Sequence, residues 1–340
     1  MQKQKLLATF VHISDLHIGS IDPDTGDANI SPGVQFGLDN FPVFDGLLGH
    51  RGLALQHLAK FVDDLRDRDE KFHILVSGDV SRFGDWQELA LAQRFLERQI
   101  DLDPASGDTV GLCAAGRLLT IPGNHDHWAG NAGPVGATPS SYYSRFIEEL
   151  PHMTCFPLGS HGRTLRLIEI DSDADVLPNS IQRIYARGNF SSQLKKLDTQ
   201  LEPRPEREVR TLLIHHSRTW PGFELGMAGK AKQDLDAFIQ RQDVSVILCG
   251  HTHLSSARRH YSGVHECWEF GAGTTTQLDT VPFKWRLKLR DPGRIKPNPN
   301  SLFVHRIFDV DGRLEWMATS YIRSRQGFNP LSPPRQFALH

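Results

Sequence analysis

The chain has 340 residues, of which 39% are hydrophobic and 23% are charged, and its formal net charge is −2. These values are ordinary for a globular protein with a sizeable core, and they exclude a global field that would recruit nucleic acid or a membrane surface. No apolar stretch reaches the roughly 18 residues of a membrane-spanning helix, and Met1–Phe10 lacks the long apolar region of a signal peptide. We therefore expect a soluble, cytoplasmic protein.

The first predicted strand ends in two potential metal ligands. Residues 8–13 are rich in β-branched and aromatic side chains, and Asp15 and His17 follow them closely. Asp and His two positions apart on an extended turn point the same way, so both could reach one metal ion, although a lone Asp-x-His also occurs without function. The next loop, 20–50, is rich in Gly, Pro, Asp and Asn, and we interpret it as part of a substrate mouth or as a passive insertion.

The second predicted strand ends in a carboxylate. Apolar residues at helical spacing predict an amphipathic helix over 53–67, and a strand follows over 72–77. Asp79 comes at the end of this strand, where a buried carboxylate is costly unless it is paired or bound to a metal. We predict that a helix and then a loop lead to the next strand, over 86–100 and 101–115.

The stretch 121–126, Ile-Pro-Gly-Asn-His-Asp, carries the densest group of potential ligands. The apolar run 118–121 predicts a buried strand that ends at Pro-Gly, and Asn124, His125 and Asp126 follow at once. Ligands of α/β folds usually bind at such carboxyl ends of strands, although the same three residue types are also ordinary turn formers. This stretch alone therefore leaves both interpretations open.

The middle of the chain holds three aspartates in one segment. We predict a Gly-rich loop, a helix, a strand and a second helix over 127–138, 142–150, 165–170 and 191–200. Between the last two lie Asp171, Asp173 and Asp175, which could bind a cation. We favour a solvated acidic loop for them.

Two further strands end in histidines. His215 and His216 follow a predicted strand over 211–214, and Gly-His251-Thr-His253 follows another over 244–249. Two histidines at positions i and i+2 of a turn form a chelating pair. The loop 217–229 could line a pocket or simply pack, and a helix is predicted over 231–242.

The C-terminal part is predicted to be mostly strands. Residues 283–290 alternate apolar and basic side chains, which indicates a strand with one basic face; it could attract a polyanion, although we favour a solvated face. The other strands are expected over 264–270, 302–308 and 314–320, the last two as a hairpin turning at Asp311-Gly312. No repeat or linker divides the chain, so we expect one domain over 1–322 and an irregular Pro-, Ser- and Arg-rich tail over 323–340.

One pattern thus occurs five times: an apolar strand followed by oxygen or nitrogen ligands. Such a set without thiolates suits Mn, Fe or Zn, and we expect Cys249 and Cys267, which lie in apolar runs, to be buried thiols instead. The candidates are too many for one ion and suit two that share a bridging carboxylate. They are Asp15, His17, Asp79, Asn124, His215, His251 and His253.

These blocks, in this order, resemble the calcineurin-like metallophosphoesterase family, and the resemblance covers about residues 8–276. It implies an α/β (α+β) fold, a four-layer α-β-β-α sandwich of two mixed β-sheets flanked by helices. It also implies a catalytic centre in which Asp79 bridges two ions and His125 contacts the phosphate and assists the leaving group. The first ion would be held by Asp15, His17, Asp79 and His253, and the second by Asp79, Asn124, His215 and His251.

Residues next to the candidate ligands distinguish the branches of the family. Purple acid phosphatases have a Tyr where this chain has Arg82, and Ser/Thr protein phosphatases have a Glu where it has Asp126. The overall run most resembles bacterial phosphodiesterases of cyclic nucleotides or glycerophosphodiesters. We therefore expect a dinuclear phosphodiesterase, rather than a monoesterase, that hydrolyses a small phosphate ester by attack of a metal-activated hydroxide. Arg82 would neutralise a substrate phosphate or pair with Asp85 on the surface, and His216 would face the substrate or support the ligand beside it.

Two other functions remain in view. A nuclease acting on DNA or RNA would use the basic strand 283–290 and the long loops as a groove. A non-catalytic scaffold would be expected to have lost ligands, yet every expected position is filled. The sequence leaves open the oligomeric state and the choice among Mn, Fe and Zn.

Overall fold

The computed structural model describes residues 4–19, 52–68, 70–103, 108–128, 143–159, 162–178, 180–263, 265–276, 299–331 and 333–339. Three predictions lie outside these residues: the loop 20–50, most of the loop 127–138 and the basic strand 283–290.

The first sheet combines three parallel strands with an antiparallel extension. Its order is β14-β13-β12-β1-β2-β5, and β15 also pairs with β13. Strands β1, β2 and β5 run parallel, so their carboxyl ends meet at one edge. The bounds are β1 Gln4–Ile13, β2 His73–Val76, β5 Leu118–Thr120, β12 Ser301–Val310, β13 Arg313–Ser324, β14 Gly327–Pro330 and β15 Arg335–Leu339.

The second sheet has the order β10-β11-β9-β8-β7-β6. Strands β7, β8, β9 and β11 are parallel, so a second set of carboxyl ends meets at one edge. The bounds are β6 His152–Leu158, β7 Arg163–Glu169, β8 Glu208–Leu213, β9 Val244–Cys249, β10 Ser255–Ser262 and β11 His265–Ala272. A short separate hairpin joins β3 Ile100–Asp103 and β4 Asp108–Val110.

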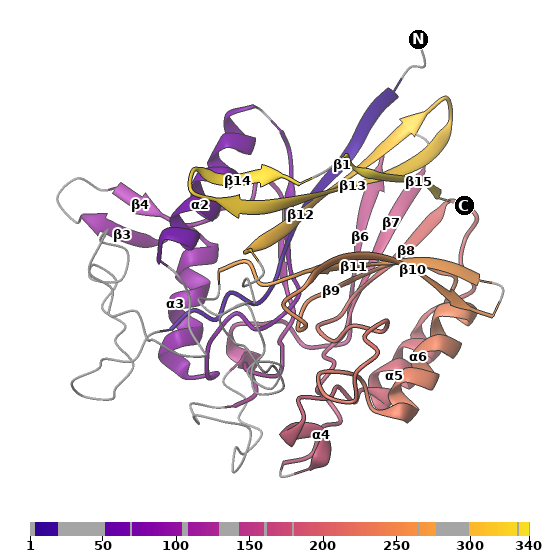
Figure 1. Cartoon of the computed structure of the whole chain (residues 1–340). Coiled ribbons are helices and arrows are strands. Elements are labelled where there is room, and N and C mark those ends of the chain that lie inside the picture. Colours follow the sequence, from indigo (N-terminus) through magenta and orange to yellow (C-terminus); the bar gives the residue numbers. More distant parts are fainter. Residues whose placement is uncertain are drawn as a thin grey trace, which may run out of the picture.

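Three apolar cores hold the layers together. One lies between the two sheets and includes Phe10 and Trp316 from the first sheet and Leu213 and Phe270 from the second. A second core packs α2 Gly52–Asp67 and α3 Trp86–Leu96 onto the outer face of the first sheet. A third packs α5 Ser191–Gln200 and α6 Gly229–Gln242 onto the outer face of the second. Figure 1 shows these helices on opposite sides of the sheets, so the predicted four-layer mixed α/β fold is confirmed.

Four local predictions are corrected by the structure. The helix expected over 142–150 is only a 3₁₀ turn, Tyr143–Arg145, and Leu150 precedes a proline, which disfavours the helical conformation at that residue. The helix expected over 86–100 ends at Leu96, and Arg98 then adopts a left-handed conformation with φ 56°. The loop expected over 101–115 contains the β3–β4 hairpin, and β6 and β10 were not expected.

The irregular tail expected over 323–340 is also wrong. The proposed boundary at 322 falls inside β13, and both β14 and β15 pair antiparallel with that strand. Phe328 is buried in the core beneath α2, and the ring of Phe337 lies 5.0 Å from that of Trp268. These two aromatic anchors bind the tail to the sheets in spite of its polar composition.

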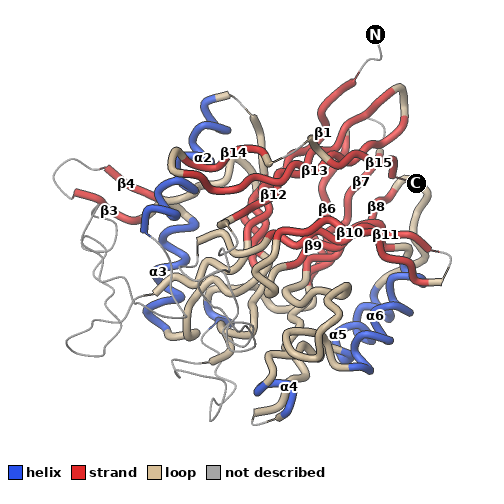
Figure 2. The backbone as a smooth tube through the Cα atoms, in the orientation of Figure 1, coloured by secondary structure: helices blue, strands red, loops and turns tan. Residues whose placement is uncertain are grey.

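The connecting loops gather at one end of the two sheets. Figure 2 shows these tan segments below the ends of the strands, where the carboxyl ends of the parallel strands meet. Within the described part of the chain, every helix is too short or too polar to cross a membrane. Cys249 and Cys267 are buried free thiols, as expected.

Candidate metal centre

All seven predicted ligands come together at this loop-bearing end. Asp15 and His17 follow β1, Asp79 follows β2, and Asn124 and His125 follow β5. The second sheet contributes the histidines after β8 and β9. Potential ligand atoms lie within 4.8 Å of one another in three overlapping groups: Asp15, His17 and His253; His17, Asp79 and His125; and Asp79, His215 and His251.

Five of these residues have a strained backbone. Each has a positive φ between 47° and 68°, in the left-handed region that non-glycine residues seldom adopt. Hydrogen bonds between the turns stabilise this backbone conformation. Among them, Asp15 N–H donates to the Gly78 carbonyl (3.0 Å) and His17 N–H donates to the Asp79 carbonyl (2.9 Å). Such strain is concentrated at functional sites in proteins. The five residues are Asp15, His17, Asp79, His251 and His253.

Glycines in the motifs allow the turns to approach closely. A Cβ atom on Gly123 would overlap Asp79 Oδ1 and lie 2.5 Å from Asp79 N. A Cβ atom on Gly250 would overlap Ser14 Oγ and lie 2.6 Å from Asp15 Oδ2. Only glycine therefore fits at these two positions while the carboxylates keep their places.

Lone pairs converge around His215. Its Nδ1 lies 2.6 Å from the Ser77 carbonyl, which can only accept, so Nδ1 carries the proton and Nε2 carries the lone pair of the neutral ring. By the same argument the Nε2–H of His251 donates to the Ala186 carbonyl (3.0 Å) and leaves Nδ1 as an acceptor. Three acceptor atoms surround His215 Nε2: His251 Nδ1 at 3.1 Å, Asp79 Oδ2 at 3.3 Å and Asn124 Oδ1 at 3.3 Å. Four acceptors that face one another fit a shared cation.

A second group of unsatisfied atoms surrounds Asp15. Its Oδ1 and both ring nitrogens of His17 are buried without a hydrogen-bond partner among the described residues. Asp15 Oδ1 lies 3.2 Å from His253 Nε2 and 3.9 Å from His17 Nε2. Because buried polar atoms are nearly always satisfied, these orphans also fit a metal ion.

The electrostatics of the site lower the pKa of both of its carboxyl groups, those of Asp15 and Asp79, and keep them ionised. Burial raises the pKa of Asp79, but the imidazoles of His215 and His125 outweigh it and the pKa is lowered. Burial lowers the pKa of His215, yet the Asp79 carboxylate raises it to about 10, so a proton occupies the place that a cation would take. Burial and then His215 lower the pKa of His251 to about 3 and keep it neutral, the form that binds metals.

His125 is oriented from three sides. Its N–H donates to Asp79 Oδ1 (2.9 Å), its Nδ1 lies 2.8 Å from the Arg82 carbonyl, and its ring stacks on Trp128 at 3.8 Å. The Arg82 side chain is only 3% exposed and lies over the Phe83 ring at 4.0 Å. This burial excludes the surface pair with Asp85 that was one of the two interpretations.

His216 is buried behind the ligands. Its Nδ1 lies 2.7 Å from Ser172 Oγ, and its Nε2 lies 3.2 Å from the Ala186 carbonyl, which also receives His251. Gly188 permits this packing, because a Cβ there would lie 2.8 Å from the His216 ring. Both ring nitrogens are therefore engaged within the protein.

The sequence reasoning missed the role of several residues that hold the site. Asp126 accepts from the N–H groups of Val80, Ser81 and Gly123 and from Ser81 Oγ, and so clamps the Asp79 turn to the next one. The buried threonines 274–276, after β11, hold residues 14–16 through three side-chain hydrogen bonds. The only sequence signal for the second group is a run of three Thr directly after a strand.

The expected solvated acidic loop is wrong for two of its three aspartates. Asp171 and Asp173 are 3% and 7% exposed, and Asp171 Oδ1 lies 3.1 Å from His127 Nε2. Burial raises the pKa of Asp173 to about 7. Asp175 accepts from Ser192 N–H (2.7 Å) in the first turn of α5. The first two aspartates are buried because they follow β7 at the same edge as the ligand histidines.

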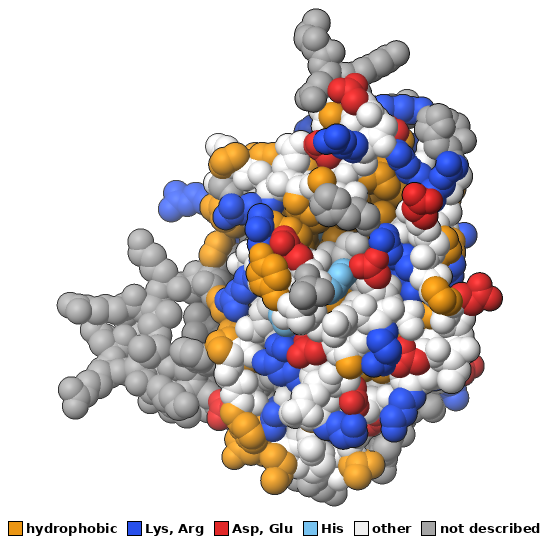
Figure 3. Space-filling model, turned by 90° about the vertical axis from the view of Figure 1, so that its right-hand side faces the viewer, with side chains coloured by type: hydrophobic (Ala, Val, Ile, Leu, Met, Phe, Trp, Pro, Cys, Tyr) orange, Lys and Arg blue, Asp and Glu red, His pale blue; other side chains and the backbone are white. Residues whose placement is uncertain are grey.

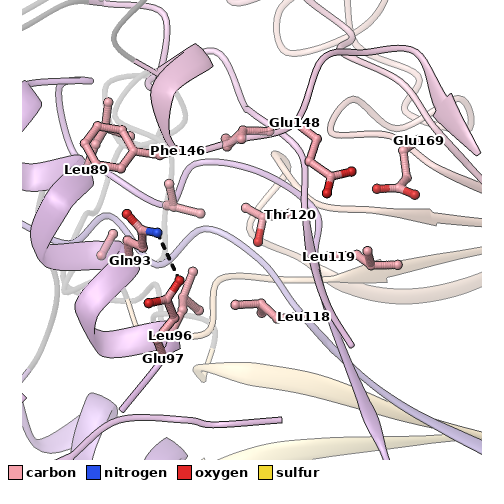
Figure 4. Close-up of a pocket in the computed structure, with 13 residues that line it drawn as sticks. Leu89, Gln93, Leu96, Glu97, Leu118, Leu119, Thr120, Phe146, Glu148 and Glu169 are labelled. Carbon is pink, nitrogen blue, oxygen red and sulfur yellow. Dashed lines mark hydrogen bonds between the residues drawn. The ribbon is translucent and has the colours of Figure 1, made fainter. Parts of the chain in front are cut away.

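A separate cavity of about 170 Å³ lies between α3 and β5 (Figure 4). Leu89 and Leu118 are among its apolar lining residues, and the carboxylates of Glu97, Glu148 and Glu169 also line it. None of the candidate ligands is among its lining residues. On the face shown in Figure 3, the basic and acidic side chains of the described residues are interspersed.

Two packed mixed sheets with a cluster of carboxylate and imidazole ligands at one end define a metallophosphoesterase-type α/β sandwich. A sequence model described as Calcineurin-like phosphoesterase matches residues 8–255, so the chain belongs to the calcineurin-like phosphoesterase family. Family membership and the ligand clusters together support a metal-dependent phosphoester hydrolase.

Three solved structures are similar to this chain at low sequence identity, and the first of them shares its fold. GAP50, the anchor in the inner membrane complex of Plasmodium, is 11% identical with a TM-score of 0.52, and the match covers 97% of this chain and 90% of that one. Vacuolar protein sorting 29 from Cryptosporidium parvum is 11% identical over 98% of this chain and all of that one, with a TM-score of 0.39. Wild-type Vps29 from Entamoeba histolytica, complexed with Zn²⁺, is 10% identical over 97% of this chain and 98% of that one, with a TM-score of 0.37. No protein with a curated description matches this chain.

Proposed function

We propose that this chain is a dinuclear metal-dependent phosphodiesterase that hydrolyses a small phosphate ester. The convergence of lone pairs on one point beside His215 Nε2 carries the proposal, and the orphaned atoms around Asp15 support a second ion. Asp79 is the proposed bridge, because its carboxylate belongs to groups on both sides. The first ion would be held by Asp15, His17, Asp79 and His253, and the second by Asp79, Asn124, His215 and His251.

Two ions bound here would activate a water molecule and neutralise the attacking and leaving oxygens of an in-line displacement at phosphorus. The protein residues would then orient the substrate. Because the Arg82 carbonyl holds Nδ1–H of His125, Nε2 is the nitrogen available to a phosphate oxygen. Burial lowers the pKa of His125 to about 3 and keeps the free ring neutral, whereas an anionic phosphate beside Nε2 would raise this pKa. His125 would then take up a proton from solvent as the substrate binds and give it to the leaving group.

Arg82 and His216 are proposed to act on the site through their neighbours. The carbonyl of Arg82 orients His125, while its guanidinium lies against Phe83. His216 packs against the ring of His251 at 4.1 Å and shares the Ala186 carbonyl with it, which favours support of the ligand over direct contact with the substrate. The preference for diesters rests on the resemblance of the motif run to bacterial phosphodiesterases.

The test compares hydrolysis of bis-p-nitrophenyl phosphate and p-nitrophenyl phosphate by metal-stripped protein with Mn, Fe(II) or Zn added back. We expect faster turnover of the diester and strict dependence on metal. Asn124→Ala should lower the metal content, because it removes a ligand. His125→Ala should keep the metal content of the wild type but lose about 10²–10³-fold in rate, the usual effect of removing one group that stabilises the transition state.

His152→Ala is the matched control, because this half-exposed histidine on β6 pairs with Glu148 away from the site. It should keep both the rate and the metal content. Turnover of the monoester alone would refute the diester preference. Wild-type activity in His125→Ala, or activity in the absence of metal, would refute the proposed mechanism.

A further inference from the structure

The structure contains a second kind of ligand cluster, built from His127, Asp171 and Asp173. One potential ligand atom of each lies within 4.8 Å of the other two, and all three residues are buried. None of them belongs to the proposed dinuclear centre. His127 follows the turn after β5, and both aspartates follow β7, so the cluster joins a loop of the first sheet to an edge of the second.

Its distances suit a bound ion. His127 Nε2 lies 3.1 Å from Asp171 Oδ1. Two bonds of 2.0–2.2 Å at a tetrahedral angle place ligand atoms about 3.4 Å apart, close to this separation. The hydroxyl of Tyr143 donates to the other oxygen, Asp171 Oδ2, at 3.3 Å and so fixes the orientation of that carboxylate.

Asp173 supplies the independent observation. The residue is more than nine-tenths buried, and its Oδ2 has no hydrogen-bond partner within the described ranges. The nearest ring nitrogen that pairs with it is His216 Nδ1 at 3.7 Å, and that atom is already engaged with Ser172 Oγ. A buried carboxylate oxygen with no partner is costly, and Asp173 belongs to a cluster whose other members are metal-ligand types.

We propose that His127, Asp171 and Asp173 bind a third divalent cation, such as Mn²⁺ or Zn²⁺, independently of the dinuclear centre. One imidazole and two carboxylates suit these ions, and the charges of the two carboxylates match a dication. Arg183 donates from Nη2 to the His127 carbonyl at 2.7 Å and closes the cluster on one side. The ion would link the turn that carries Asn124 and His125 to the end of β7.

The competing arrangement is an ion pair without metal, in which the His127 imidazolium serves as the cation for Asp171. The number of bound ions separates the two arrangements. We would equilibrate the full chain with Mn²⁺ by dialysis and measure manganese per chain by elemental analysis at saturation. The wild type is expected to bind three ions, and Asp173→Asn two.

Asp175→Asn is the matched control, because this aspartate lies in the same segment but accepts from Ser192 N–H and is not part of the cluster. It should bind three ions, since Asn keeps a carbonyl oxygen that can accept from this N–H. Equal numbers of bound ions in the wild type and Asp173→Asn would overturn the third site. A variant that failed to fold would lose all of its ions rather than one. Failure of the dinuclear centre would instead lower the number of ions in all three proteins and leave the difference of one ion between the wild type and Asp173→Asn.

Discussion

Replacing Gly123 by alanine should displace the proposed bridging carboxylate. The added Cβ would lie 2.5 Å from Asp79 N, about 0.9 Å inside the 3.4 Å at which ordinary contact begins, and it would overlap Asp79 Oδ1. Backbone atoms cannot rotate away, so the Asp79 turn must shift by nearly 1 Å. Overpacking of this kind costs about 1–3 kcal/mol, and a 1 Å displacement at a reacting centre lowers rates by about 10²-fold.

Three measurements on Gly123→Ala check this reasoning: metal content by elemental analysis, thermal unfolding, and hydrolysis of bis-p-nitrophenyl phosphate. We expect fewer than two ions in the proposed dinuclear centre, a lower melting temperature and a rate about 100-fold lower. Gly229→Ala is the control, because nothing lies within 4 Å of its Cβ at the start of α6 and alanine favours a helix. Full metal content and a wild-type rate in Gly123→Ala would show that Gly123 does not set the position of Asp79.

Three further predictions concern stability. Asp126→Asn should lower the free energy of unfolding, measured in urea, by about 3 kcal/mol, because the amide nitrogen cannot accept from the surrounding donors. The control Asp85→Asn, at the N-cap of α3, should change this free energy little. Equal effects of the two substitutions would contradict the proposed role of Asp126. Burial raises the pKa of Glu88 from 4.5 to about 8, so the folded protein holds this proton in a pH window where the unfolded chain has lost it. The free energy of unfolding should therefore fall as pH rises from about 5 to 8, by up to about 1.4 kcal/mol per pH unit. Glu88→Gln should flatten this pH dependence in denaturation curves. An unchanged slope in the variant would refute the assignment to Glu88. Removing metal with a chelator should lower the melting temperature. The free energy of unfolding should fall by about 2.7 kcal/mol relative to protein with free metal at 100 times its Kd. An unchanged melting temperature in calorimetry would contradict a built metal site.

The candidate ligands could be predicted from the sequence because each one directly follows an apolar strand. Once β1, β2 and β5 are recognised as neighbouring parallel strands, their carboxyl ends must share an edge, and Asp15, Asp79 and Asn124 must lie near one another. Apolar spacing likewise predicted the helix over 53–67, which is α2 in the structure. Local patterns were misread elsewhere, at the helix expected over 142–150 and at β6, which was not expected.

The remainder depends on contacts between distant residues. Asp171 and His127 are separated by 44 positions, and nothing near either one in the chain indicates that they pair in a buried site. Strand β10, Ser255–Ser262, is polar and mostly exposed, so no hydrophobic alternation marks it, and it forms because β11 offers a complete ladder. The left-handed backbone of the ligands is also a tertiary property, held by hydrogen bonds between turns that are far apart in sequence.

Each proposed ion takes its ligands from both sheets. His251 N–H donates to Asp15 Oδ2 across 236 positions, and Asp79 meets His215 across the same boundary. The spacing of the proposed ions would therefore be set by how the two sheets pack, far from the loops themselves. A substitution in the central core, for example at Phe10 or Leu213, could slide one sheet over the other and retune the chemistry without touching a ligand. Substitutions in the core between the sheets, as well as those in the loops around the site, would therefore offer ways to adapt this protein to a new substrate or metal.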